Sequence, residues 1–258
     1  MTTNPPPRIG LIVPASNTAA EVQFQRYAPA GVGVHTTRLR MTGQWQRPLR
    51  EMAGAITDAA AALSDTSPGV IVFHCTANSM AEGNAGEAHI LDLIEKASGC
   101  PALTTGLAVK EALAELRLKR LVLISPYVKA TNAHEIEFLG EAGFEVLHDL
   151  GLGLSGGGDE YLRITPREWT ALTVENHRAE ADGYFLSCTA TSMIEAIEDV
   201  EQSLHKPVVA SNQAVLWSAL RRIGITEPVV GLGRLFQVRA SAAAVAGRDA
   251  PAGRRPSG

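Results

Sequence analysis

The sequence predicts an α/β protein with two similar lobes, each built on a parallel sheet, and a functional site between them. Short apolar runs alternate with stretches of helical periodicity along most of the 258 residues. One cysteine-centred segment also occurs twice, each time after an apolar run. Strands that alternate with helices form right-handed parallel units, whose ligand sites lie at the carboxyl ends of the strands. The two lobes are expected to be related by an approximate two-fold axis.

The strands are predicted from short apolar runs that end at turn residues, as buried parallel strands do. These runs are residues 8–14, 32–40, 69–74, 119–125, 144–147, 183–187 and 207–210. Helices are predicted between them from apolar side chains at helical spacing. The helical stretches are residues 49–64, 84–97, 105–117, 130–142, 167–181, 191–204 and 213–223.

This order predicts a first lobe over residues 1–118 and a second over residues 119–237, with chain exchange near the C-terminal end left open. Residues 238–258 are rich in Ala, Arg, Gly and Pro, and we expect them to be disordered. The Gly-rich segment 152–159 lacks the Lys-Ser/Thr ending of a phosphate loop. We interpret it as a mobile lid or a plain connection.

Composition excludes several classes of partner. The formal charge is -4, which argues against a general nucleic-acid or membrane-surface binder. No apolar run reaches the roughly 18 residues that a transmembrane helix needs. The N-terminal Met-Thr-Thr-Asn-Pro-Pro-Pro has no apolar signal core, so we expect a cytoplasmic protein.

The three cysteines, Cys75, Cys100 and Cys188, are predicted to be free thiols. An odd number is a poor disulfide framework, and no pair has the spacing of zinc ligands. Cys75-Thr-Ala-Asn-Ser-Met80 and Cys188-Thr-Ala-Thr-Ser-Met193 agree at five of six positions, whereas Cys100 has no such context. Core packing alone would not require the same polar residues to follow two different cysteines. The repeat therefore indicates two reactive cysteines and a structural Cys100.

This repeat predicts acid–base or nucleophilic chemistry. Helix N–H groups after each cysteine would favour the thiolate and bind a carboxylate, with hydroxyl donors from Thr76, Ser79, Thr189 and Ser192. Two thiols facing one small ligand could act as base or nucleophile and as proton donor. An ordinary thiol pKa of about 8.5 would need only a modest downward shift.

Asn17, Tyr127, His74 and the pair Asp159–Glu160 are further candidates for the site. Asn17 could cap a helix and also donate to a carboxylate, and Tyr127 occupies the corresponding loop of the second lobe. Strand alternation points the His74 side chain away from that of Cys75, which favours a packed histidine over a general base. The pair at 159–160 reads as a solvated loop end.

Residues 8–237 resemble the aspartate/glutamate racemase superfamily, in the branch of maleate cis-trans isomerases and arylmalonate decarboxylases. The resemblance is carried by Ile12-Val-Pro-Ala-Ser-Asn17-Thr18, the segment around Cys75, Ser125-Pro-Tyr127, Leu186-Ser-Cys188 and Gly231-Leu-Gly-Arg-Leu-Phe236. The decarboxylases keep only the second cysteine, so Cys75 places the chain beside the isomerases and racemases.

The resemblance implies a cofactor-independent enzyme in which Cys75 adds to an alkene and Cys188 supplies a proton. Asn17 and Tyr127 would hold carboxylates. The full set of candidate substrate-binding residues is Asn17, Thr76, Asn78, Tyr127 and Thr189. Asp159 stands near the place of an asparagine of the isomerases, where it would repel a carboxylate. The resemblance also implies a homodimer or a higher homo-oligomer.

The leading hypothesis is a cis-trans isomerase of a small, maleate-like unsaturated dicarboxylate. The same thiols would also suit a two-base racemase of a small carboxylate, and a third possibility is an arylmalonate-type decarboxylase. Outside the enzymes, two lobes around a cleft also describe a dicarboxylate-binding protein. Polar residues after each cysteine imply a pocket more polar than that of the isomerases, and a substrate other than maleate itself fits this difference.

Overall fold

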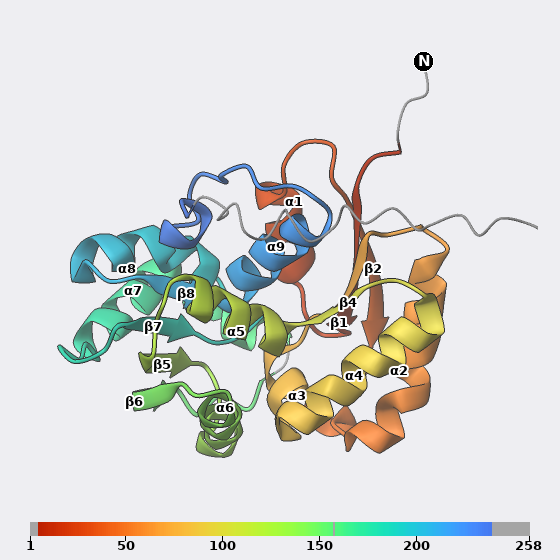
Figure 1. Cartoon of the computed structure of the whole chain (residues 1–258). Coiled ribbons are helices and arrows are strands. Elements are labelled where there is room, and N and C mark those ends of the chain that lie inside the picture. Colours follow the sequence, from red (N-terminus) through yellow and green to blue (C-terminus); the bar gives the residue numbers. More distant parts are fainter. Residues whose placement is uncertain (1–4, 157, 239–258) are drawn as a thin grey trace, which may run out of the picture.

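The computed structural model describes residues 5–156 and 158–238, and within them two parallel sheets are flanked by helices (Figure 1). Each sheet has four strands, in the order β2-β1-β3-β4 and β6-β5-β7-β8. The two sheets have the same topology, because β1 to β4 occupy the same places in the first sheet as β5 to β8 do in the second. The predicted α/β class with two similar parallel sheets is therefore confirmed, and β3 and β7 hold equivalent central places.

The first half carries the sheet that leads to Cys75. Its elements are β1 (Arg8–Pro14), α1 (Ala20–Tyr27), β2 (Gly33–Leu39), η1 (Gly43–Trp45), α2 (Leu49–Ser64), β3 (Val70–Phe73), α3 (Thr76–Met80), α4 (Gly83–Ser98), β4 (Ala102–Thr104) and α5 (Thr105–Glu115). Strand β1 pairs in parallel with both β2 and β3. Six of its seven residues are buried, as expected for a strand covered on both faces.

The second half repeats this order and leads to Cys188. Its elements are β5 (Arg120–Ser125), α6 (Lys129–Glu141), β6 (Glu145–Gly151), η2 (Gly158–Arg163), α7 (Pro166–Glu175), β7 (Gly183–Leu186), η3 (Met193–Ala196), α8 (Ile197–Leu204), β8 (Val208–Ala210), α9 (Ser211–Arg222) and η4 (Arg234–Phe236). Helix α7 begins at a capping box between Thr165 and Glu168, with Pro166 in its first turn.

The core joins the two sheets. Along β1, Ile9, Leu11 and Val13 belong to a buried cluster that also contains residues of β5, β7 and α9. Ile12 faces the other way, into a second cluster with residues of α2 and α4. Strand alternation explains this division. Because one cluster includes residues of both halves, the separation into two lobes at residue 118 stays a prediction.

Several boundaries differ from the sequence-based expectation. Strand β4 and helix α1 were not predicted, since β4 has only three residues and α1 only eight. The helix expected over 167–181 ends at Glu175, and the one expected from 191 begins as a 3-10 turn at Met193. The predicted disordered tail lies, from residue 239 onward, outside the described residues.

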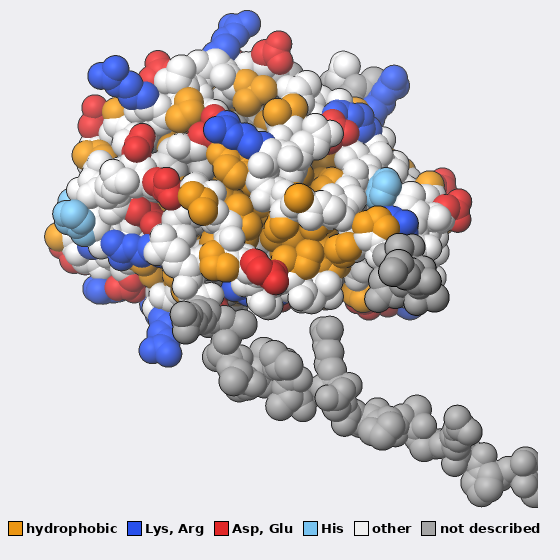
Figure 2. All heavy atoms as spheres, turned by 90° about the horizontal axis from the view of Figure 1, so that it is seen from above, with side chains coloured by type: hydrophobic (Ala, Val, Ile, Leu, Met, Phe, Trp, Pro, Cys, Tyr) orange, Lys and Arg blue, Asp and Glu red, His pale blue; other side chains and the backbone are white. Residues whose placement is uncertain are grey.

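Figure 2 shows hydrophobic side chains gathered between charged ones on one face of the molecule. Two strongly exposed valines are Val22 of α1 and Val230 in the segment after α9, at 62% and 91% exposure. The expected homo-oligomer stays a prediction. Within the same residues, no helix combines the length and apolar character needed to cross a membrane.

Candidate active site

A pocket with a volume of about 170 Å³ opens where strands of both sheets end. Cys75 and Cys188 both line it, and none of its lining residues is a Lys, Arg, His, Asp or Glu. The lining residues are Pro14, Ser16, Asn17, Thr42, Gly43, Gln46, Cys75, Ala77, Asn78, Tyr127, Val128, Thr131, Leu154, Ser155, Gly156, Tyr161, Cys188, Thr189 and Ala190. A ligand here would meet two thiols and uncharged hydrogen-bonding groups.

Cys75 follows β3 and is the N-cap residue of α3, in an extended conformation with φ of -151°. Its side chain is 5% exposed. The backbone N–H of Asn78 lies against the sulfur and acts to lower the pKa of Cys75. This is the local arrangement that the sequence predicted for the first cysteine.

Cys188 reaches the pocket by a different backbone path. Its φ is 152°, a sparsely populated conformation for a non-glycine residue. The chain continues in turns rather than in a helix, and the Ala190 N–H donates to Cys188 Sγ over 3.3 Å. The Tyr127 hydroxyl also interacts with this sulfur and acts to lower its pKa.

Burial outweighs these donors for both thiols. Desolvation raises the pKa of Cys75 and that of Cys188 to about 12. A charge at Cys75 also raises the pKa of Cys188. The helix N–H groups that the sequence predicted to favour a thiolate are thus outweighed, because burial destabilises a thiolate by more than these donors stabilise it.

Asn17 lies at the end of β1 and is 1% exposed. Its Oδ1 accepts from the N–H groups of Ala19 and Ala20, both at 3.0 Å, which caps the first turn of α1. Its Nδ2 donates to the carbonyl oxygen and to Oγ1 of Thr189, both at 3.1 Å. Asn17 therefore caps α1 and ties the first sheet to the loop that carries Cys188.

Two tyrosines meet above the pocket. Tyr127 follows β5, and its ring packs edge to face against that of Tyr161, with centroids 5.9 Å apart. Tyr161 belongs to η2 and was not predicted as a site residue. Burial raises the pKa of Tyr161 and that of Tyr127 well above the ordinary value of a tyrosine, so both hydroxyls stay protonated donors.

Only one of the four predicted hydroxyl donors lies in a residue that lines the pocket. Thr189 lines the pocket, but Thr76 does not, and its Oγ1 donates to Ser211 Oγ over 2.9 Å. Ser79 donates to the Thr76 carbonyl and Ser192 to that of Ile164, so neither faces the pocket. The expectation of four pocket donors does not fit these three, because Ser79 bonds within its own turn while Thr76 and Ser192 bond to segments distant in the sequence.

Asn78 does line the pocket, and its Nδ2 donates to the Met41 carbonyl over 2.6 Å. This bond fixes the carboxamide one turn after Cys75. Ser211, the first residue of α9, accepts from Thr76 and also from the Cys188 N–H, at 3.2 Å. It therefore links the two cysteine loops, a role that the sequence did not indicate.

His74 and Asp159 lie away from the pocket. His74 is fully buried, its ring packs edge to face on Phe24 at 5.3 Å, and burial lowers its pKa to about 3. It is a packed neutral histidine, as predicted. Asp159 is exposed and outside the lining, so the expected repulsion of a substrate carboxylate does not follow. Cys100 is half-buried and outside the lining.

The described residues contain no cluster of three or more His, Cys, Asp or Glu side chains arranged to hold a metal ion. They do contain an unexpected buried carboxyl, Glu135 of α6, close enough to the thiols to act on the pKa of each. No local sequence pattern marks Glu135, since its position near the thiols depends on how α6 packs.

Comparison with known proteins agrees with this geometry. Residues 9–236 match the family model of arylmalonate decarboxylase. A maleate isomerase from Geobacillus stearothermophilus is 25% identical over 243 residues, which are 89% of this chain and 96% of the relative. An arylmalonate decarboxylase from Bordetella bronchiseptica is 28% identical over 239 residues, with the same coverage of 89% and 96%.

A solved structure shares the fold as well. It is a cysteine-to-serine mutant of Nocardia farcinica maleate cis-trans isomerase that carries a covalently bound succinylcysteine intermediate. The TM-score is 0.78 and the identity 23%, over 89% of this chain and 98% of that one. Two kinds of reaction are thus represented among similar proteins.

Proposed function

The chain belongs to the arylmalonate decarboxylase family, and we propose that within it this protein is a cofactor-independent cis-trans isomerase of a small, maleate-like dicarboxylate. The observation that carries the proposal is that Cys75 and Cys188 line one uncharged pocket. The isomerase relative and the succinylcysteine of the Nocardia structure support the use of a cysteine as nucleophile.

The proposed reaction needs one proton shared by the two sulfurs. The Cys75 thiolate forms a carbon–sulfur bond to one alkene carbon, and the alkene electrons take the proton of Cys188 at the neighbouring carbon. The former alkene carbons are now joined by a single bond, and rotation about this carbon–carbon bond brings the carboxylates to the trans arrangement. The Cys188 thiolate then removes the added proton, and the carbon–sulfur bond breaks. The trans product and the Cys75 thiolate are released, with no net change in oxidation state.

Neutral donors would hold the carboxylates in this proposal. The backbone N–H groups at the start of α3 and the hydroxyls of Tyr127, Tyr161 and Thr189 surround the pocket. Asn17 would contribute an Nδ2 hydrogen only by giving up one of its two bonds to Thr189. Thr76 takes part through Ser211 and not by contact with the substrate.

Proton NMR of maleate incubated with the enzyme tests the proposal. Wild type should convert the maleate signal into that of fumarate, and Cys75→Ser and Cys188→Ser should each lose this conversion. Cys100→Ser is the matched control, because Cys100 lies outside the pocket. Failure of wild type to convert maleate or any close unsaturated analogue would reject an isomerase.

A decarboxylase is the second candidate, favoured by the 28% identity to the Bordetella enzyme. Carbon dioxide release from an arylmalonate that survives Cys75→Ala but not Cys188→Ala would select it. Loss of optical activity of a small amino or hydroxy acid, abolished by either substitution, would instead select the racemase. Tight binding of a dicarboxylate without turnover would select the binding protein.

A further inference from the structure

A carboxyl group near the two thiols is buried without a hydrogen-bond partner among the described residues. Glu135 is 0% exposed, and neither Oε1 nor Oε2 makes a hydrogen bond within the described part of the chain. The Ser187 hydroxyl lies beside it and slightly lowers its pKa, yet Ser187 Oγ also lacks a bond of normal geometry. An unpaired carboxylate inside a protein is strongly disfavoured, so this site holds the protonated acid.

Glu135 is near the reactive groups but outside the pocket. A charge on Glu135 raises the pKa of Cys75 and of Cys188, and also those of Tyr127 and Tyr161. Its side chain is absent from the pocket lining, so a substrate would not touch it. Any effect of Glu135 on the reaction would therefore be exerted by its charge and not by contact with the substrate.

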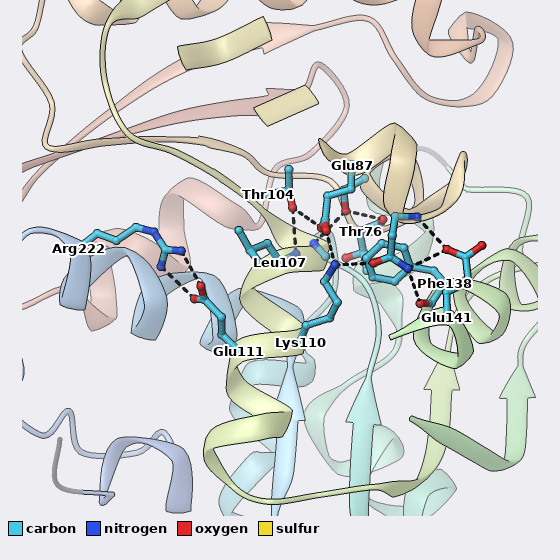
Figure 3. A network of polar contacts seen from close by, with 12 residues as sticks. Thr76, Glu87, Thr104, Leu107, Lys110, Glu111, Phe138, Glu141 and Arg222 are labelled. Carbon is cyan, nitrogen blue, oxygen red and sulfur yellow. Dashed lines mark hydrogen bonds and ion pairs between the residues drawn. The ribbon is translucent and has the colours of Figure 1, made fainter. Parts of the chain in front are cut away.

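Other ionisable groups packed on α6 have partners of their own. Glu87 of α4 and Lys110 of α5 form an ion pair (Figure 3). Lys110 Nζ lies 4.6 Å from the ring centroid of Phe138, three residues after Glu135 in α6. Asp149 of β6 accepts from Asn132 over 2.9 Å. Glu141 of α6 accepts from Asn84 at 2.8 Å, and α3 brings no ionisable group besides its cap, Cys75. The other ionisable side chains of α6 are exposed: Lys129, His134 and Glu137.

We propose that Glu135 is a positioning residue that supports the two thiols in its protonated form and switches them off when it ionises. The inference rests on the proposed use of Cys75 and Cys188. A neutral Glu135 adds no charge to a pocket that must hold a thiolate and a dianion. When hydroxide removes its proton, giving water and a carboxylate, a further negative charge in a low-dielectric region opposes both.

The test measures thiol reactivity and needs no substrate. Alkylation of Cys75 and Cys188 by iodoacetamide would be followed by mass spectrometry from pH 6 to pH 10 in wild type, Glu135→Gln and Glu135→Asp. Wild type and Glu135→Gln should react equally at pH 6, where both are neutral. At pH 9.5 Glu135→Gln should react faster by about tenfold, the effect of one unit of thiol pKa.

Glu135→Asp restores an ionisable group and should return the slower alkaline reaction. A rate ratio that is the same at pH 6 and pH 9.5, or no difference at either pH, would overturn the inference. These readouts stay informative if no isomerase activity is found, so failure of this idea and failure of the proposed function are distinguishable.

A second measurement covers the case in which Glu135→Gln does not fold. Wild type labelled with carbon-13 at glutamate carboxyls should show one resonance that titrates near pH 8, lost in Glu135→Asp. Glu201, a second carboxyl whose pKa burial raises, accepts from the backbone N–H of Val208 and serves as the internal comparison. If the Glu135 resonance titrates below pH 5, the proposal is wrong.

Discussion

The carboxamide of Asn17 donates to both the carbonyl and the hydroxyl oxygen of Thr189, a residue 172 positions away in the chain. The same side chain accepts from two N–H groups of α1. One residue therefore fixes the start of a helix and the loop of the second cysteine. These two tasks use different atoms, which makes them separable by substitution.

Asn17→Ala should lose both the cap of α1 and the bonds to Thr189, whereas Asn17→Asp should lose only the bonds to Thr189. The alanine variant should be less stable by about 1–2 kcal/mol, since the helix cap is removed. The aspartate keeps the cap but cannot donate to Thr189, so its activity should fall by more than its melting temperature suggests. Thr18→Ala, at an exposed neighbour, is the control. Equal loss of stability and activity in both variants would contradict this division.

Ser211→Ala should uncouple the two cysteine loops. It leaves the Thr76 hydroxyl and the Cys188 N–H buried without their acceptor, at a cost of about 1–3 kcal/mol for an unsatisfied group. We expect kcat to fall more than KM changes, because Cys188 moves while the carboxylate donors stay. A double-mutant cycle with Thr76→Val should be non-additive. Ser203→Ala, on an exposed turn of α8, is the control.

The repeated cysteine segment shows which features of the site could be predicted from the sequence and which could not. The repeat, with an apolar run before each copy, was enough to predict equivalent strands and a shared pocket. It was not enough to predict local structure, since Thr76–Met80 forms a helix while residues 189–192 form turns. Nearly identical residues thus take different conformations, because tertiary contacts override local preference.

Other site residues had no signal in the sequence at all. Glu135, Tyr161 and Ser211 belong to α6, η2 and α9, outside the repeated segments. Their relation to the thiols is set by the packing of distant elements, and no periodicity or spacing encodes it. The raised pKa of the two thiols could not be predicted for a related reason, since the depth of burial of Cys75 and Cys188 is a tertiary property.

Glu135 should also make stability depend on pH. Burial raises its pKa from 4.5 to about 8, so the folded state keeps a proton that the unfolded state loses above pH 4.5. Stability should therefore fall as pH rises from about 4.5 to 8, by roughly 1.4 kcal/mol per pH unit, and this contribution should be absent in Glu135→Gln. Urea unfolding at pH 5 and pH 7 measures it.

Glu137→Gln, at an exposed site of the same helix, controls for loss of a surface charge. Parallel pH dependence in wild type and Glu135→Gln would show that the buried carboxyl is not protonated in the folded state.

Thiol reactivity in the empty pocket should be low at neutral pH. With a pKa of about 12, Cys75 and Cys188 are almost entirely protonated at pH 7. Alkylation should be slower than that of a free cysteine peptide by about 100-fold or more, and should accelerate with rising pH. Mass spectrometry separates these two sites from the half-buried Cys100. Rapid alkylation of Cys75 at pH 7 would contradict the raised pKa.

The last prediction concerns the contact between the Gly-rich segment and Tyr161. Gly156 has φ of +81°, and a Cβ built there would lie 2.1 Å from the Tyr161 hydroxyl oxygen. Gly153 has a similar φ of +72°, but its Cβ would meet nothing within 4 Å. Both alanine substitutions therefore strain the backbone alike, and only Gly156→Ala must displace the tyrosine.

We expect Gly156→Ala to raise KM or lower kcat for the dicarboxylate by at least about tenfold relative to Gly153→Ala, with similar melting temperatures. Tyr161→Phe should reproduce part of the loss if the hydroxyl is a carboxylate donor, since the ring still packs on Tyr127. Equal kinetics in the two glycine variants would mean that the position of Tyr161 does not matter to the reaction.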